Sequence, residues 1–170
     1  MRINIFAIFT LIAVYGGVSF AAGSQKTASE QIFGNMTYFV GYKDPKPVTL
    51  HNGRYCRRFV WDVNYHQQYV YGDFNHDGLK DAAVIIWVNP GGGNIDEGVL
   101  TFLINDGTKL IHRASQYLED HAIINSVKEK NGKVVVDMYV HQEGDCHAGP
   151  SRRVRRVYEY PGPQFPKGQA

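Results

Sequence analysis

Oxygen-bearing side chains recur at alternate positions of the segment 73–81, which has the sequence DFNHDGLKD. Calcium is a hard cation that takes six to eight oxygen ligands at about 2.3–2.6 Å, from carboxylates, amides, backbone carbonyls and water. Gly78 stands where a chain that turns tightly around an ion has no room for a Cβ atom. The spacing predicts a calcium site whose ligands are Asp73, Asn75, Asp77, the backbone carbonyl of Leu79, and Asp81, directly or through water.

The residues around this segment distinguish it from an EF-hand. An EF-hand loop places a bidentate glutamate at its twelfth position, which is Val84 in this chain. Residues 82–88 form an unbroken apolar run that stops at Asn89-Pro90-Gly91, and its length and β-branched side chains predict a buried strand. We therefore expect a strand–loop–strand site that holds a structural ion. The alternative is a solvated turn with no ion, since Asp, Asn and Gly are also common turn residues.

The sequence GDFNHDGLKDAAV resembles the DxNxDGxxD loop of FG-GAP and VCBS-type repeats, and more distantly the dockerin loop. The wider pattern more closely resembles a group of small uncharacterised exported bacterial proteins, in which GD(L/F)NxDGxxDAAV precedes a glycine cluster and a Thr-Phe-containing strand. Here these are Gly91-Gly92-Gly93 and Thr101-Phe102. The resemblance implies calcium at the same five residues and supplies no catalytic residue. The loop occurs once, which excludes a propeller built from several such repeats.

The N-terminus has the pattern of an export signal. Arg2 precedes an apolar core at residues 3–14, and the small residues Ser19 and Ala21 precede a cleavage position after Ala21, with Gly23 as a second option. We therefore expect a signal peptide at residues 1–22 and a periplasmic or secreted protein, with an uncleaved membrane anchor as the alternative. The rest divides into a flexible leader at 23–35, one β-rich domain at 36–160 and a disordered tail at 161–170.

The chain has two cysteines, Cys56 and Cys146. Because an even pair in an oxidising compartment usually forms a bridge, the sequence predicts a disulfide between them. The alternative is a catalytic thiol at Cys146, beside His147. The net charge is only +2, so composition gives no reason to expect a nucleic-acid partner, and we expect a monomer.

Turn signals recur about every ten residues, including Asn52-Gly53, Asp106-Gly107 and Asn131-Gly132, and no long helical periodicity intervenes. This pattern predicts a mainly β fold, an antiparallel β-meander in the form of a curled sheet or a small barrel, with one or two short helices. The helical candidates are residues 29–33 and the polar segment 114–120, which is either a loop or a single helical turn.

Two further clusters have a structural explanation that we favour. Residues 152–156, Arg-Arg-Val-Arg-Arg, could bind anionic glycans or lipid headgroups, but charge also protects an exposed edge strand from aggregation. His141, Glu143, Asp145 and His147 alternate along one polar loop and could gather around a transition metal, although such loops are more often solvated.

The sequence favours a non-enzymatic role, in which the domain binds an envelope component or a partner protein. It contains no Gly-x-Ser-x-Gly, Ser-x-x-Lys or HExxH motif. The alternatives are a hydrolase, whose site would lie in the loops at 89–98 and 141–151, and an inhibitor of a secreted hydrolase.

Overall fold

The computed structural model describes residues 28–41, 44–57, 61–91, 96–146 and 149–165. The expected signal peptide at 1–22 lies outside the described residues. The described elements are α1 (Ala28–Phe33), β1 (Thr37–Val40), β2 (Lys46–Thr49), β3 (Arg54–Arg57), β4 (Trp61–Gly72), β5 (Asp81–Asn89), β6 (Glu97–Asn105), β7 (Leu110–Asp120), β8 (Ile123–Lys130), β9 (Lys133–Val140) and β10 (Arg152–Tyr158). Within these ranges, no helix has the length and apolar character needed to cross a bilayer.

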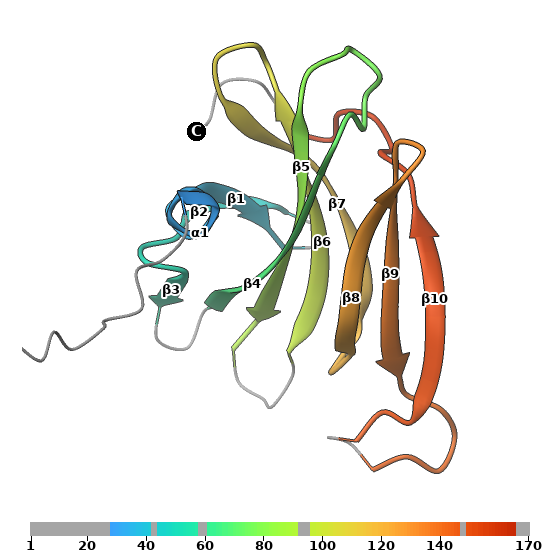
Figure 1. Ribbon diagram of the computed structural model, residues 1–170. Coiled ribbons are helices and arrows are strands. Elements are labelled where there is room, and N and C mark those ends of the chain that lie inside the picture. The colour runs from blue at the N-terminus through green and yellow to red at the C-terminus, as the bar shows by residue number, and fades with distance from the viewer. Residues whose placement is uncertain (1–27, 42–43, 58–60, 92–95, 147–148, 166–170) are drawn as a thin grey trace, which may run out of the picture.

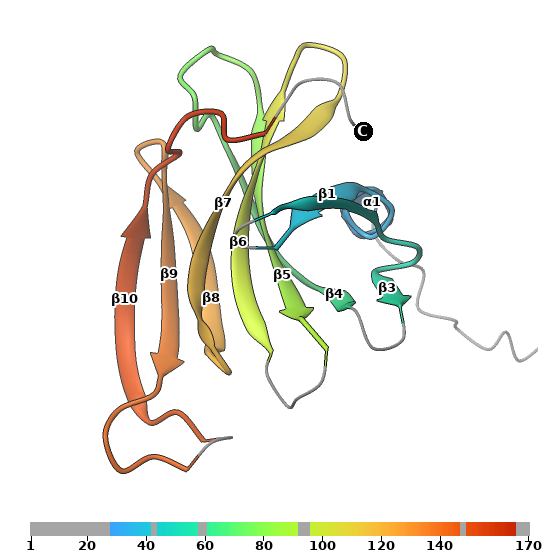
Figure 2. The ribbon, with the colours of Figure 1, turned by 180° about the vertical axis from the view of Figure 1, so that it is seen from behind.

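The described strands form three antiparallel sheets, which confirms the mainly β prediction (Figures 1 and 2). The largest has the order β3-β4-β5-β6-β7, so each strand pairs with the next one in the chain. A three-stranded sheet has the order β10-β9-β8, and β1 pairs with β2 in a separate ribbon. The meander is therefore confirmed. The sheets are open rather than closed into the small barrel that was one of the two predicted forms.

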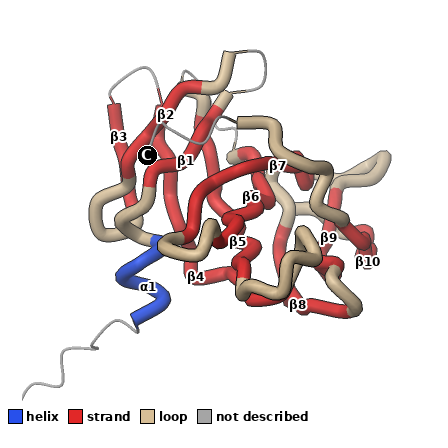
Figure 3. Tube along the Cα trace, turned by 90° about the horizontal axis from the view of Figure 1, so that it is seen from above, coloured by secondary structure: helices blue, strands red, loops and turns tan. Residues whose placement is uncertain are grey.

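Viewed from above, the five-stranded sheet lies between the other two (Figure 3). One core fills the space between its central strands and the β8–β10 sheet, and it includes Ile85, Phe102 and Met138. A second core lies on the other face, under α1 and the β1–β2 ribbon, and it includes Phe33, Tyr38 and Ile86. Because successive side chains of a strand point to opposite faces, β5 supplies both cores, which explains its unbroken apolar sequence.

The short helix expected near residues 29–33 is confirmed as α1. Phe33 at its end is fully buried, and its ring lies 5.0 Å from that of Tyr69. The carbonyl of Phe33 also accepts a hydrogen bond of 2.9 Å from the buried hydroxyl of Tyr38. These contacts attach α1 to the β1–β2 side of the large sheet.

The polar segment 114–120 is a strand rather than the expected loop or helical turn. It forms the second half of β7, which pairs with β6 through two register irregularities. Ala114 and Leu118 are buried in the core between the sheets, whereas Ser115 and Tyr117 point to the opposite face of the strand. One face of an antiparallel strand can be polar, and pairing with β6 overrides the weak local preference.

The predicted disulfide is wrong, because Cys56 and Cys146 are both free and exposed. Cys56 is in β3, at the edge of the five-stranded sheet, and Cys146 is in the loop after β9, in the other sheet. These elements lie at opposite sides of the molecule in Figures 1 and 2. A disulfide needs Cα atoms within about 7 Å of each other, which this arrangement of sheets prevents.

Candidate functional site

The predicted calcium loop connects β4 to β5. Gly72 and Asp81 are register partners at the end of the ladder between these strands, so residues 73–80 close a compact loop. The chain reverses through two left-handed backbone conformations, at His76 (φ 61°) and at Gly78 (φ 83°). The glycine thus occupies a position where a left-handed turn favours it. The expected lack of room for a Cβ atom is wrong, because such an atom would meet nothing within 4 Å.

The first predicted ligands turn their oxygen atoms into the loop. Asp73 accepts hydrogen bonds from the N–H of Asp77 on Oδ1 (3.1 Å) and from the N–H of Gly78 on Oδ2 (3.0 Å). The Oδ1 atom of Asn75 accepts from the same N–H of Asp77, at 3.2 Å. Two side-chain oxygens therefore converge on one backbone N–H.

Asp77 is the third predicted ligand whose side-chain oxygens accept hydrogen bonds within the loop. Its Oδ1 atom accepts a hydrogen bond of 2.8 Å from the N–H of Leu79, and its Oδ2 atom accepts one of 2.7 Å from the amide of Asn75. In the described part of the chain, no three His, Cys, Asp or Glu side chains are gathered as a metal centre would gather them. The side-chain oxygens of Asp73 and Asp77 are thus directed at N–H groups of the loop itself.

Asp81 differs from the other predicted ligands because it is fully buried. Its Oδ2 atom accepts a hydrogen bond of 2.9 Å from the N–H of Phe74, and its Oδ1 atom accepts one of 2.8 Å from the N–H of Asn105. Burial raises the pKa of this carboxyl and the charge of Asp77 raises it further, while the backbone donors oppose the shift. Asp81 thus serves as the anchor of the loop to the sheet.

The loop also contacts the second sheet. Phe74 is buried in the core between the sheets, with its ring edge-on to Phe102 at 5.6 Å. The turn between β8 and β9 lies so close that a Cβ atom at Gly132 would be 2.6 Å from Cε1 of His76 and 3.3 Å from the carbonyl oxygen of Asp73. The conformation of the loop is therefore coupled to the packing of both sheets.

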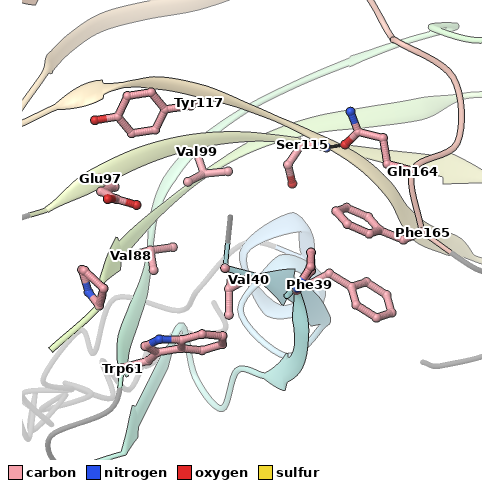
Figure 4. A pocket seen from close by; sticks show the side chains of 13 residues that line it. Phe39, Val40, Trp61, Val88, Glu97, Val99, Ser115, Tyr117, Gln164 and Phe165 are labelled. Atoms are coloured by element: carbon pink, nitrogen blue, oxygen red, sulfur yellow. Dashed lines mark hydrogen bonds between the residues drawn. The ribbon is translucent and has the colours of Figure 1, made fainter. Parts of the chain in front are cut away.

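Sequence reasoning missed an apolar cleft of about 540 Å³ (Figure 4). Its walls come from the β1–β2 region, the start of β4, the facing ends of β5 and β6, the middle of β7 and the C-terminal segment. The lining residues are Phe39, Val40, Gly41, Pro45, Trp61, Val88, Pro90, Glu97, Val99, Ser115, Tyr117, Gln164 and Phe165. No local pattern marks this cleft, since it forms only when distant segments pack together.

The acidic residue of the cleft lining, Glu97, has a second carboxylate beside it. Glu97 on β6 is the register partner of Asp120 on β7. Partial burial raises the pKa of Glu97, and the charge of Asp120 raises it further. Burial and the neighbouring carboxylates, Glu97 first among them, also raise the pKa of the Tyr117 hydroxyl to about 12. The cleft therefore has a negative potential around Glu97.

A smaller, more polar cleft of about 260 Å³ is lined by a different set of residues, Asn64, His66, Trp87, Asp96, His121 and Ala122. The N–H of His121 donates to the carbonyl of Asp96 at 3.0 Å, and the His121 ring lies 6.4 Å from that of His141. His121 thus contacts one residue from each of the two loops in which a hydrolase site was expected. Its Nδ1 atom is 2.6 Å from Oδ1 of Asp120.

The basic cluster at 152–156 lies on β10, which is at the edge of its sheet, where the edge-protection interpretation requires it. Arg153 forms two hydrogen bonds with Asp137, at 2.9 and 3.0 Å, and Arg156 bonds Glu119 at 2.7 Å. Carboxylates of the same protein therefore engage much of this charge. Of the four residues that could gather around a transition metal in the loop 141–147, His147 lies outside the described residues.

Comparison of the chain with protein-family models, with curated proteins and with solved structures finds no match. The case for a function therefore comes from the chemistry of the loop and of the two clefts.

Proposed function

We propose that this protein is an exported calcium-binding β-domain with a non-enzymatic, binding or structural role in the cell envelope. The observation that carries the proposal is the convergence of the Asp73, Asn75 and Asp77 side-chain oxygens inside one loop that ends at the buried Asp81. Export to the periplasm or beyond follows from the signal-like segment 1–22. There the domain would bind an envelope component or a partner protein.

The donor set suits calcium. Asp73, Asp77 and Asp81 supply three carboxylates, Asn75 supplies an amide oxygen, and Leu79 supplies a backbone carbonyl, with water to complete the shell. Oxygen-only donors select hard cations over transition metals. An ion would neutralise the repulsion between Asp77 and Asp81, which contributes to the raised pKa of Asp81. We infer a structural role because the loop contacts both sheets.

The test is thermal unfolding of residues 24–170 in calcium and in a chelator. A native-state ion raises the melting temperature by mass action. Asp77→Asn keeps the shape of the side chain but removes one ligand charge, so the calcium-dependent rise is expected to shrink strongly. Asp73→Asn should behave in the same way.

The matched control is Asp106→Asn. Asp106 is also an exposed turn aspartate whose oxygen accepts backbone N–H bonds, from Thr108 and Lys109 at 3.0 Å, but it lies in the β6–β7 turn. Its variant should keep the full calcium response. An equal response in wild type, Asp77→Asn and Asp73→Asn would remove residues 73–81 as the site.

A second candidate, a hydrolase, is favoured by the Asp120–His121 pair at the smaller cleft. A carboxylate at 2.6 Å from one ring nitrogen orients an imidazole so that the other nitrogen can act as a base toward water. Hydrolysis of chromogenic ester and glycoside substrates tests this candidate. Activity that is lost in His121→Gln, with unfolding unchanged, would support it; no hydrolysis by the wild-type protein would reject it for these substrates.

A further inference from the structure

We propose that the 540 Å³ cleft is a binding site for a small organic cation with an apolar body, with Glu97 as the counter-charge and Trp61 as the main contact surface. This site is separate from the calcium loop and uses none of its residues.

The size and lining of the cleft suit a small molecule. Ligand sites in proteins commonly enclose about 300–1,000 Å³ and combine apolar walls with a few polar groups. Four aromatic side chains line this cleft, and its polar side chains are Glu97, Ser115, Gln164 and the hydroxyl of Tyr117. Figure 4 shows Glu97 and Tyr117 toward one end and Phe39 and Phe165 toward the other, with Trp61 on the side opposite Tyr117 and Ser115.

The charge of the lining decides the class of ligand. Glu97 is the one acid among the lining residues, and none of them is Lys, Arg or His. Asp120, paired with Glu97 across the strands, adds to the negative potential. A carboxylate or phosphate ligand would meet repulsion without a compensating base. A cation would gain attraction from Glu97 and from the faces of the aromatic rings.

The walls are fixed in place by their own contacts. Gly41 has a φ of 110°, and a Cβ atom there would lie 3.2 Å from Cη2 of Trp61, so the glycine allows the indole to lie against the backbone. On the other side, the rings of Phe39 and Phe165 stack with centroids 4.9 Å apart. These contacts orient two of the aromatic walls before any ligand binds.

The C-terminal segment that completes the cleft is held by hydrogen bonds. The N–H groups of Gln164 and Phe165 donate to the carbonyl of Arg113 at 2.7 and 3.2 Å. The Oε1 atom of Gln164 accepts from the N–H of Ser115 at 2.9 Å, the bond drawn in Figure 4. This wall is therefore a fixed part of the fold, and the ligand would not have to order it. Preorganisation of this kind reduces the cost of binding.

The experiment measures binding of benzyltrimethylammonium, benzyl alcohol and benzoate to the purified protein, by calorimetry and by indole fluorescence. The chain has two tryptophans, so Trp87→Phe leaves Trp61 as the sole indole reporter. We expect the affinity to fall in the order cation, neutral alcohol, anion. Glu97→Gln should weaken binding of the cation about fivefold and leave that of the alcohol unchanged, in line with one partly exposed charge pair.

Glu143→Gln, at an exposed position of the β9–β10 loop, is the matched control and should not change any of the affinities. Trp61→Leu should weaken the cation and the alcohol alike and abolish the fluorescence response. Equal affinity for all three compounds, binding of benzoate alone, or an equal loss in Glu97→Gln and Glu143→Gln would overturn the proposal. So would the failure of all three compounds to bind.

Discussion

The Oδ1 atom of Asp81 accepts a hydrogen bond of 2.8 Å from the backbone N–H of Asn105, 24 residues further along the chain. Its Oδ2 atom accepts from the N–H of Phe74. Both donors are then satisfied by one fully buried carboxylate. Asp81 therefore connects the loop to the end of β6 through hydrogen bonds that need no ion.

Asp81→Asn should lower the free energy of unfolding in chelator by about 1–3 kcal/mol, because the amide nitrogen cannot accept a bond and leaves one buried N–H unsatisfied. Urea denaturation measures this loss. Asp77→Asn, at an exposed position, is the control and should cost much less without calcium. Equal costs for the two variants would contradict the anchoring role of Asp81.

The stabilisation by calcium should decrease as the pH falls. Because the pKa of Asp81 is raised in the folded state, its protonated form is favoured there, and the contribution of Asp81 to ion-free stability is lost as the pH rises through the folded pKa. Calcium requires the carboxylate and competes with that proton. The calcium-dependent rise in melting temperature should therefore be smaller at about pH 4.5, near the ordinary carboxyl range, than at neutral pH. A rise that does not depend on pH would argue against Asp81 as a ligand.

His112 should make the folded protein less stable as the pH falls, which is the opposite of the effect of Asp81 on ion-free stability. It is buried, its Nδ1 atom accepts the N–H of Phe39 at 2.9 Å, and burial lowers its pKa to about 3. In the unfolded chain the His112 ring takes up a proton near pH 6.5. Its contribution to the free energy of unfolding is therefore fully present above that pH and is lost as the pH falls toward 3. Urea denaturation should show a loss of about 1.6 kcal/mol between pH 6.5 and 5, because the slope approaches about 1.4 kcal/mol per pH unit only well below pH 6.5.

The contribution of His112 can be separated by substitution. In His112→Gln this part of the pH dependence should disappear, although the variant is less stable overall. The pKa values of Asp106, Asp137 and Asp145 are lowered by their hydrogen-bond partners, so these groups contribute below this pH window. An unchanged slope in His112→Gln would assign the acid sensitivity to other groups.

Gly132→Ala should be more destabilising than Gly107→Ala. Both glycines have positive φ, at 73° and 92°, so an alanine at either one pays a similar backbone cost of about 1–2 kcal/mol. Only at Gly132 would the new methyl group also strike His76, since nothing lies within 4 Å at Gly107. The difference in unfolding free energy should shrink when His76 is also changed to alanine, which leaves only the approach to the Asp73 carbonyl oxygen at 3.3 Å. If the difference does not shrink, the contact with His76 is not its main cause.

Cys56 and Cys146 should both react with a thiol reagent in the folded, unreduced protein, because both are free and exposed. The double variant Cys56→Ser with Cys146→Ser should keep the wild-type melting temperature. A large drop in that variant, together with no reactive thiol in the wild type, would restore the disulfide.

The features predictable from the sequence are local ones. An apolar run bounded by turn residues predicts the strand after the loop, and β5 contains that run. The Asn131-Gly132 turn was expected because its mirror-image geometry favours these residues, and both have positive φ. The convergence of Asp73 and Asn75 follows from their spacing. By contrast, β7 is a strand because β6 pairs with it, and the cleft exists because Phe165 stacks on Phe39, more than a hundred residues away. Such contacts leave no periodic trace in sequence.

Both faces of β5 are buried, and this limits local unfolding of the molecule. Ala83 and Ile85 belong to one core, while Val84 and Ile86 belong to the other. Separation of either outer layer would expose one full row of this strand to water, so neither layer can detach at low cost. Amide hydrogens of β5 should then exchange only through global unfolding, and the three sheets should form a single cooperative unit in native-state exchange.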